Sequence, residues 1–231
     1  MIKTSNNNVP FYDDLNFMIN NSEGLILDIW GVLWDGIKVY PEALNTLKKL
    51  NERNIPIVLL SNAPRKSDIV SEKLSKIGIG KNLYNKIISS GDVCRNELIN
   101  NTNIVSGVKY YFIGLKEDND LLDNTKFQES KNPEGSDFVL ITGPRDFDHI
   151  LKDYTNELKE CLKYKLPMIC ANPDKIVYRG NKKIDCAGAL ALNYENMSGK
   201  VKYFGKPYAE IYDYILNNLQ VSNPEITKKD L

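Results

Sequence analysis

The chain has 231 residues, which is enough for one large domain or two small ones with a substantial core. Its 30 basic residues balance 30 acidic ones, so no net charge attracts nucleic acid or an anionic membrane. The single histidine, His149, excludes a multi-histidine zinc site, and any Ser-His-Asp or Cys-His system would depend on it alone. Its place in RDFDHILKDY, at the start of a predicted helix, favours an ordinary surface role.

Cysteine usage and the N-terminal sequence indicate a cytoplasmic protein. The four cysteines are scattered without a C-x-x-C pair, which predicts reduced, structural thiols. The N-terminal sequence MIKTSNNNVPFYDD has neither the apolar core of a signal peptide nor the arginines of a transit peptide. No apolar run approaches the roughly 18 residues that a membrane helix needs. We therefore expect a soluble protein with no membrane partner.

The first third of the chain alternates predicted helices and strands. A short helix over 13–20 precedes a buried strand that ends in Asp28. The elements that follow are a helix over 41–51, a strand over 55–60, a helix over 66–77 and a strand over 86–90. This alternation predicts an α/β fold with an open parallel sheet and right-handed crossovers.

A second α/β unit is predicted after residue 91. Its strands are expected at 110–113, 138–142 and 167–171, with a helix over 147–164 before the last of them. After Asp185 a helix over 186–197, a strand over 202–204 and a helix over 208–219 are expected to resume the first unit. The predicted domains are a discontinuous core of residues 1–91 and 186–231 and an insertion of residues 92–185.

The stretch GLILDIWGVLWD, residues 24–35, carries the first candidate site residue. A strand buried on both faces leads Asp28 into a turn that Gly31 makes sterically easy. In parallel sheets, ligands bind outside the carboxyl ends of the strands, where Asp28 is expected. A charge there is costly unless it is paired or holds a metal, which suggests chemistry. The alternative is an aspartate that caps the next helix.

Four segments in fixed order resemble one family. They are DIWGVLWDG at 28–36, LLSNAPR at 59–65, ICANPD at 169–174 and YFGKPY at 203–208. Over about Gly24 to Leu219 the chain resembles the haloacid dehalogenase-like hydrolases, specifically the class IIA branch related to nitrophenyl and phosphoglycolate phosphatases. The resemblance implies a Rossmann-like parallel-sheet core with an inserted α/β cap, which would close over the site and exclude water.

The resemblance implies a role for each matched residue. Asp28 would take the phosphoryl group as an aspartyl-phosphate. Lys206 would stabilise charge on the transferring group. The Ser61 hydroxyl and the Asn62 N–H would bind phosphoryl oxygens. Arg65 is a candidate contact for a substrate anion, with a solvated helix start as the alternative.

The same resemblance implies a cofactor and a cap motif. Mg²⁺ would be held by Asp28 and the backbone carbonyl of Trp30, both oxygen ligands that suit this ion. Asn172 and Asp174 match the N-P-D motif of the cap, although an isolated N-P-D is simply a good turn. The implied partner is a small phosphorylated metabolite, and a homodimer through the cap is compatible with the family.

Trp30 is the first departure from the family pattern. The family usually has an aspartate two residues after the nucleophile as general acid–base, which is worth roughly 10²–10⁴-fold in rate. Indole cannot replace it at neutral pH, so hydrolysis of alkyl phosphates should be slow and that of esters with good leaving groups less affected. Asp35 is the nearest spare carboxylate, but Asp35-Gly36 is typical of a turn.

The second departure is the fourth family motif, a strand followed by G-D and further metal carboxylates. The sequence stops at PEITKKDL, where that strand would begin. We expect the chain to be a fragment of a longer protein. The alternative is a core that lacks this strand and these ligands.

Three functions are open at this point. The first is a Mg²⁺-dependent phosphatase that acts on a small phosphorylated metabolite. The second, motivated by Trp30, is a phosphate-ligand-binding or regulatory protein without chemistry. The third is a phosphotransferase, which passes the phosphoryl group to an acceptor other than water.

Overall fold

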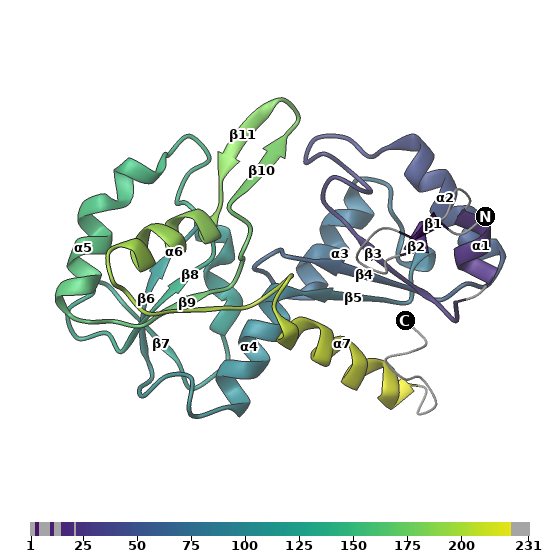
Figure 1. The fold of residues 1–231 in the computed structure, drawn as a ribbon. Helices are drawn as coiled ribbons and strands as arrows, with labels where there is room; N and C mark the ends of the chain where they lie inside the picture. The colour runs from purple at the N-terminus through teal and green to yellow at the C-terminus, as the bar shows by residue number, and fades with distance from the viewer. Residues whose placement is uncertain (1–2, 5–9, 12–14, 21, 223–231) are drawn as a thin grey trace.

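Two parallel sheets lie side by side in the chain (Figure 1). The computed structural model describes residues 3–4, 10–11, 15–20 and 22–222. The first sheet has the order β3-β4-β5, with β3 at Leu25–Asp28, β4 at Ile57–Ser61 and β5 at Lys86–Ser89. Helices α2 (Pro41–Glu52) and α3 (Ser67–Lys76) connect its strands. The predicted α/β class and the parallel sheet are confirmed.

The N-terminal segment adds two short strands and a helix. Strands β1 (Lys3–Thr4) and β2 (Pro10–Phe11) pair antiparallel, and α1 (Leu15–Asn20) follows. The helix predicted over 13–20 is found as α1, while residues 13 and 14 lie outside the described residues. The segment PEITKKDL, on which the expectation of a longer protein rests, also lies outside them.

The second sheet has five parallel strands in the order β12-β9-β8-β6-β7. Its strands are β6 (Lys109–Ile113), β7 (Gln128–Ser130), β8 (Phe138–Ile141), β9 (Met168–Cys170) and β12 (Val201–Tyr203). The helical elements beside it are the 3₁₀ segments η2 (Lys116–Leu122) and η3 (Leu151–Tyr154) and helices α5 (Thr155–Lys163) and α6 (Ala187–Asn196). The strands predicted at 110–113, 138–142 and 167–171 are therefore present.

Strand β12 differs from the sequence prediction in its partner. It pairs with β9, where Val201 lies opposite Met168 and Tyr203 opposite Cys170, and α6 packs on both strands. Residues 186–204 therefore lie with the second sheet, whereas the sequence predicted that they resume the first unit. A strand of three residues shows no pattern that selects one sheet over another, so its partner is decided by tertiary contacts.

Two helices also differ from prediction. Helix α4 (Ser90–Asn100) begins directly after β5, and the Ser89 side chain accepts its first-turn N–H from Asp92 at 3.0 Å. Its buried face includes serine and glycine, so apolar periodicity did not predict it. The helix expected over 147–164 begins only at η3, because Asp153 accepts the N–H of Ile150 at 2.9 Å and fixes the start of that turn.

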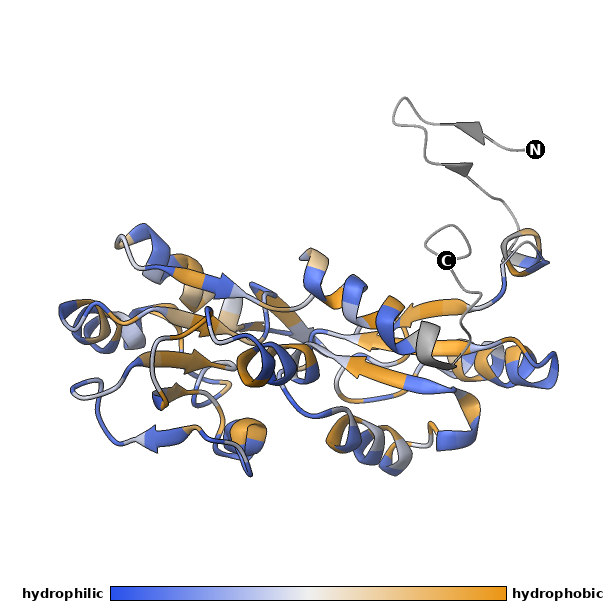
Figure 2. Cartoon of the chain, turned by 90° about the horizontal axis from the view of Figure 1, so that it is seen from below, coloured by the Kyte–Doolittle hydropathy of each residue, from blue (hydrophilic) through white to orange (hydrophobic). Residues whose placement is uncertain are grey.

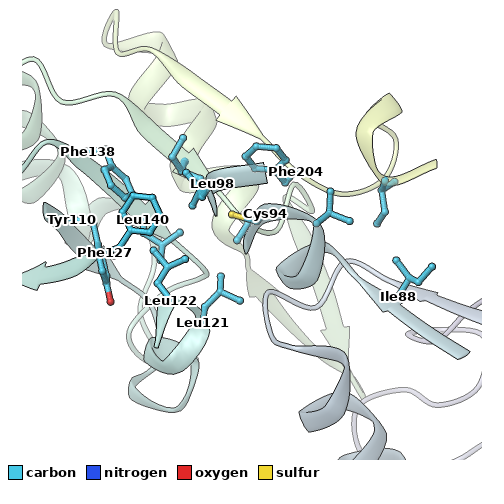
Figure 3. Packing of buried hydrophobic residues seen from close by; sticks show 14 of the residues in the cluster. Ile88, Cys94, Leu98, Tyr110, Leu121, Leu122, Phe127, Phe138, Leu140 and Phe204 are labelled. Atoms are coloured by element: carbon cyan, nitrogen blue, oxygen red, sulfur yellow. The ribbon is translucent and has the colours of Figure 1, made fainter. Parts of the chain in front are cut away.

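A continuous apolar cluster joins the two units (Figure 3). It runs from Ile88 of β5 through Cys94 and Leu98 of α4 to Phe138 of β8. Phe204, which follows β12, and Ile211 and Ile215 of helix α7 (Ala209–Ser222) also belong to it. In Figure 2 the strands of both sheets are mostly hydrophobic while the helices alternate in hydropathy. The shared cluster fixes one unit against the other and thus the shape of the space between them.

A two-stranded hairpin projects from the second unit toward the first (Figure 1). Strands β10 (Ile176–Arg179) and β11 (Lys182–Asp185) pair antiparallel. The N–H of Gly180 at the hairpin tip donates to the carbonyl of Asp35 at 3.0 Å. The hairpin therefore contacts the loop that follows β3, a contact that sequence patterns did not indicate.

All four cysteines are buried and unpaired, as predicted: Cys94, Cys161, Cys170 and Cys186. Within the described ranges, no helix combines the length and apolar character needed to cross a membrane.

Candidate active site

Asp28 and Lys206 form an ion pair where β3 and β4 end. Lys206 Nζ lies 2.6 Å from Asp28 Oδ1 and 3.3 Å from the carbonyl oxygen of Leu60. The N–H of Ile29 also donates to Asp28 Oδ1, at 2.8 Å. The Asp28 side chain is 42% exposed, so the carboxylate faces open space as well as its partner. The structure thus brings these two predicted residues together at the carboxyl edge of the sheet.

Two glycines make this approach sterically possible. Gly31 has φ +81°, which confirms the predicted glycine turn after Asp28. Gly205, directly before Lys206, has φ +122°. A Cβ at Gly205 would lie 2.7 Å from both Asn62 Oδ1 and Pro173 Cδ. Only glycine therefore lets the Lys206 loop pack against the end of β4.

Asn62 connects three of the predicted motifs through its side chain. Its Oδ1 accepts the N–H of Lys206 at 2.7 Å, and its Nδ2 donates to the carbonyl of Lys206 at 3.0 Å. The same Nδ2 donates to Asp174 Oδ1 at 2.8 Å. Because Asn62 is buried, these bonds hold the lysine loop and the N-P-D turn in fixed positions.

Ser61 and Asn172 have local roles beside Asn62. Ser61 Oγ accepts the N–H of Ala63 at 3.1 Å, and Asn172 Oδ1 accepts the N–H of Asp174 at 3.0 Å. Burial raises the pKa of Asp174, while the hydrogen bond from Asn62 and the charge of Lys206 oppose that rise. The N-P-D segment therefore forms a side-chain-stabilised turn that also reaches the end of β4.

A cleft of about 1120 Å³ lies over this group and between the two units. Asp28, Ser61, Asn62 and Lys206 line one part of it. The hairpin β10–β11, the loop after β8, the start of η2, the loop after β3 and helix α3 also line it. A cavity of this size accommodates a small metabolite.

Trp30 closes one wall of the cleft. Its Nε1–H donates to the carbonyl of Tyr178 on the hairpin at 2.9 Å. Its ring meets the Trp34 ring edge-on, with centroids 5.1 Å apart. A Cβ on Gly36 would lie 2.5 Å from the Trp30 ring, so the indole occupies a fitted position. The hairpin contact explains what Trp30 does structurally, and sequence reasoning missed it.

Asp35 is committed to the turn after Trp34. Its Oδ1 accepts the N–H groups of Lys38 and Ile37, each at 2.9 Å. These two hydrogen bonds, that of Lys38 first, lower the pKa of the carboxyl group. The turn predicted for Asp35-Gly36 is present, and its geometry gives no support to Asp35 as a replacement acid.

Arg65 lies deeper in the cleft and is engaged by the second unit. Its guanidinium pairs with Glu117 Oε1 at 2.8 Å, and its Nε pairs with Asp118 Oδ1. The Asp118 side chain is only 3% exposed, and burial raises its pKa to about 6 although Arg65 opposes the rise. Contact of Arg65 with a substrate anion stays a prediction. Asp118 itself was missed because its polar segment carries little local signal.

His149 is not among the residues that line the cleft. Its Nδ1 lies 2.9 Å from the Tyr154 hydroxyl, next to the Tyr154 ring. This contact agrees with the ordinary role that the sequence favoured for it.

The described part of the chain holds no cluster of three His, Cys, Asp or Glu side chains that could bind a metal ion. The two ligands that the resemblance implied, the Asp28 carboxylate and the Trp30 carbonyl, belong to residues that line the cleft. Both are oxygen donors. Mg²⁺ is commonly bound by one or two carboxylates together with substrate phosphate and water, so these two groups fit it.

The comparisons with known proteins agree with this geometry. Residues 25–128 match the haloacid dehalogenase-like hydrolase family. The chain is 24% identical over 208 residues to the ribonucleotide monophosphatase NagD of Escherichia coli K12, covering 88% of this chain and 77% of NagD.

Solved structures show the same relationship. A hydrolase of the haloacid dehalogenase-like family from Brucella suis 1330 superimposes with a TM-score of 0.86 at 27% identity, over 95% of this chain and 82% of that one. The 4-nitrophenylphosphatase of Thermotoga maritima has a TM-score of 0.66 at 20% identity, over 88% and 76% of the two chains, and shows the same fold. The match over residues 25–128 and the similarity to hydrolases over most of the chain thus agree with the haloacid dehalogenase-like family that the motifs indicated.

Proposed function

We propose that this protein is a phosphatase that hydrolyses a small phosphorylated metabolite through an aspartyl-phosphate on Asp28. The ion pair between Asp28 and Lys206, at the strand ends and inside the cleft, carries the proposal. Relatives named as a ribonucleotide monophosphatase and a 4-nitrophenylphosphatase support it. A partly exposed carboxylate can attack phosphorus, and a covalent intermediate divides one difficult displacement into two easier ones.

The neighbouring groups have distinct parts in this mechanism. Lys206 stabilises negative charge on the phosphoryl group as it transfers. The Ser61 hydroxyl and the Asn62 N–H bind phosphoryl oxygens, while the Asn62 side chain positions the Lys206 loop. The Asp28 carboxylate and the Trp30 carbonyl would hold Mg²⁺, which supplies positive charge between nucleophile and phosphate when bound.

The experiment is phosphate release from 4-nitrophenyl phosphate and from a panel of phosphorylated metabolites, each with Mg²⁺ and with a chelator. We expect Asp28→Asn to lower turnover by more than about 10³-fold, since a carboxamide is a poor nucleophile. Asp148→Asn is the matched control, because it makes the same chemical change at an exposed side chain paired with Lys182. Unchanged turnover in Asp28→Asn rules out the nucleophile.

A second candidate is a protein that binds a phosphorylated ligand without chemistry. Trp30 favours it, because an indole lines the cleft at the position where the family usually has an acidic side chain, and its N–H is bonded to Tyr178. This candidate predicts saturable binding of the metabolite by calorimetry with no phosphate release. It is excluded if phosphate release from any substrate depends on Asp28.

A further inference from the structure

We propose that this site expels leaving groups as anions, so its substrates are phosphate compounds whose leaving group is a weak base: a phenol, an enol or a carboxylic acid. This substrate class rests on the proposed function of Asp28. The observations behind it are the fixed position of Trp30 and the commitments of the other ionisable side chains in the cleft.

Lys206 cannot protonate the leaving oxygen, because of where it is held. Its Nζ lies 2.6 Å from Oδ1 of Asp28, the proposed nucleophile, and 3.3 Å from the carbonyl oxygen of Leu60. Phosphoryl transfer places the attacking and leaving oxygens roughly in line on opposite sides of phosphorus. A cation fixed at the nucleophile is therefore on the wrong side of the phosphoryl group to donate a proton.

The indole of Trp30 is equally unable to help. Its single N–H is already donated to the carbonyl of Tyr178, and the ring is wedged against Trp34 and Gly36. An indole N–H is a hydrogen-bond donor only and does not give up its proton at neutral pH. The side chain therefore forms part of this wall without transferring a proton.

The remaining carboxylates of the cleft are mostly bound elsewhere. Asp35 holds two N–H groups of its own turn, and Glu117 and Asp118 pair with Arg65. Asp174 accepts a hydrogen bond from Asn62. A general acid must come within hydrogen-bond reach of the leaving oxygen, directly or through one water. Because each of these carboxylates is bonded to a partner in the protein, it is not placed to donate a proton to the leaving oxygen.

Two further cleft residues are candidate proton donors. Lys73 stands 5.2 Å over the centre of the Trp34 ring, and burial lowers its pKa. Asp185 ends β11, opposite Ile176 in the hairpin. Both line the cleft, so the experiment below tests them directly.

The transfer then proceeds without enzyme-assisted proton movement. An Asp28 oxygen forms a bond to phosphorus as the bond from phosphorus to the leaving oxygen breaks, and that oxygen leaves with the electron pair. The anion takes a proton from bulk water only if its basicity requires one. A water molecule next attacks phosphorus, the bond to Asp28 breaks, and the proton of the water passes to solvent. Leaving groups with low pKa values are favoured in the first step.

The test compares substrates of nearly equal shape and different leaving-group pKa. In the protein with Mg²⁺, kcat/KM is measured for 4-nitrophenyl phosphate, phenyl phosphate and cyclohexyl phosphate. We expect kcat/KM to fall steeply along this series, with cyclohexyl phosphate slower than phenyl phosphate by at least about 10²-fold, the smallest usual worth of a general acid. Equal values for phenyl and cyclohexyl phosphate overturn this inference and leave the phosphatase intact. No hydrolysis even of 4-nitrophenyl phosphate overturns both.

Variants then separate the competing donors. Trp30→Asp places a carboxyl group at the wall and should raise kcat/KM for cyclohexyl phosphate relative to 4-nitrophenyl phosphate. Trp30→Phe, the control, removes the bond to Tyr178 without adding an acid and should change all three substrates in parallel. A loss confined to cyclohexyl phosphate in Lys73→Met or Asp185→Asn identifies that residue as a proton donor and overturns the inference. The wild-type series decides the question even if a variant does not fold.

Discussion

The two ends of the cleft each hold a carboxylate paired with a cation, and they differ in exposure. At one end the Asp28 side chain is 42% exposed beside Lys206. At the other the Asp118 side chain is 3% exposed beside Arg65. A ligand can reach the first pair and compete for its charges, whereas the second is sealed between the start of α3 and η2. Exposure therefore separates a pair suited to chemistry from one that holds the two units together.

Stability should fall most when the buried pair of Arg65 and Asp118 loses one partner. We expect Arg65→Met to lower the free energy of unfolding by about 3–5 kcal/mol at pH 7, since Asp118 would be left buried without its counter-ion. Urea unfolding measures this. The neighbouring Lys66→Met is the control: Lys66 pairs with Asp120 at 3.2 Å in a half-exposed position, so its loss should cost less than about 1 kcal/mol.

The same Arg65 variant sharpens the functional comparison. If Arg65 serves only the link between the units, KM for the folded variant should stay close to the wild-type value. A large rise in KM with unchanged stability would contradict the structural role and support the predicted contact with a substrate anion. The two measurements together therefore distinguish a link from a binding residue.

The exposed pair should respond in activity rather than in stability. We expect Lys206→Met to lower kcat/KM for 4-nitrophenyl phosphate by about 10²–10³-fold, the usual worth of one group that stabilises charge in the transition state. Lys202→Met is the matched control, because Lys202 lies in β12 and pairs with Glu210 outside the cleft. Equal activity in the two variants would remove Lys206 from the mechanism.

The sequence predicted the exposed end of the cleft much better than the buried end. Asp28 and Ser61 stand at the ends of short apolar strands, and Lys206 follows strand β12 in a matched motif, so local pattern and shared motif order agree. The turn at Gly31 could be predicted because it depends on the positive φ of this residue and on no contact with a distant part of the chain. These features depend on neighbours in the chain, which is why they could be identified before the fold was known.

The features that sequence reasoning missed depend on distant partners. Asp118 lies in a polar segment, and only the fold brings it into contact with Arg65, which lies 53 residues earlier in the chain. The strands of the hairpin β10–β11 are only four residues long each, and the contact of β10 with Trp30 joins residues far apart in the chain. Strand β12 was predicted, but its sheet was not, because pairing with β9 is a tertiary choice. Local pattern thus predicts elements and motif residues, and tertiary contacts decide what they meet.

The smallest effect expected is a change of the free energy of unfolding with pH that is caused by the titration of Asp118. Burial raises its pKa from 3.8 to about 6, so the folded state keeps this proton over a range in which an unfolded aspartate has released it. Because the folded state binds more protons there, the free energy of unfolding should fall as pH rises from about 4 to 6. The contribution is at most about 3 kcal/mol.

Urea unfolding of wild type and Asp118→Asn at several pH values isolates this contribution, since the variant lacks the titrating group and keeps the shape of the side chain. If the free energy of unfolding changes with pH in the same way for both proteins, Arg65 holds Asp118 ionised throughout this range. The buried pair would then be a charged carboxylate beside a cation, like the exposed pair of Asp28 and Lys206.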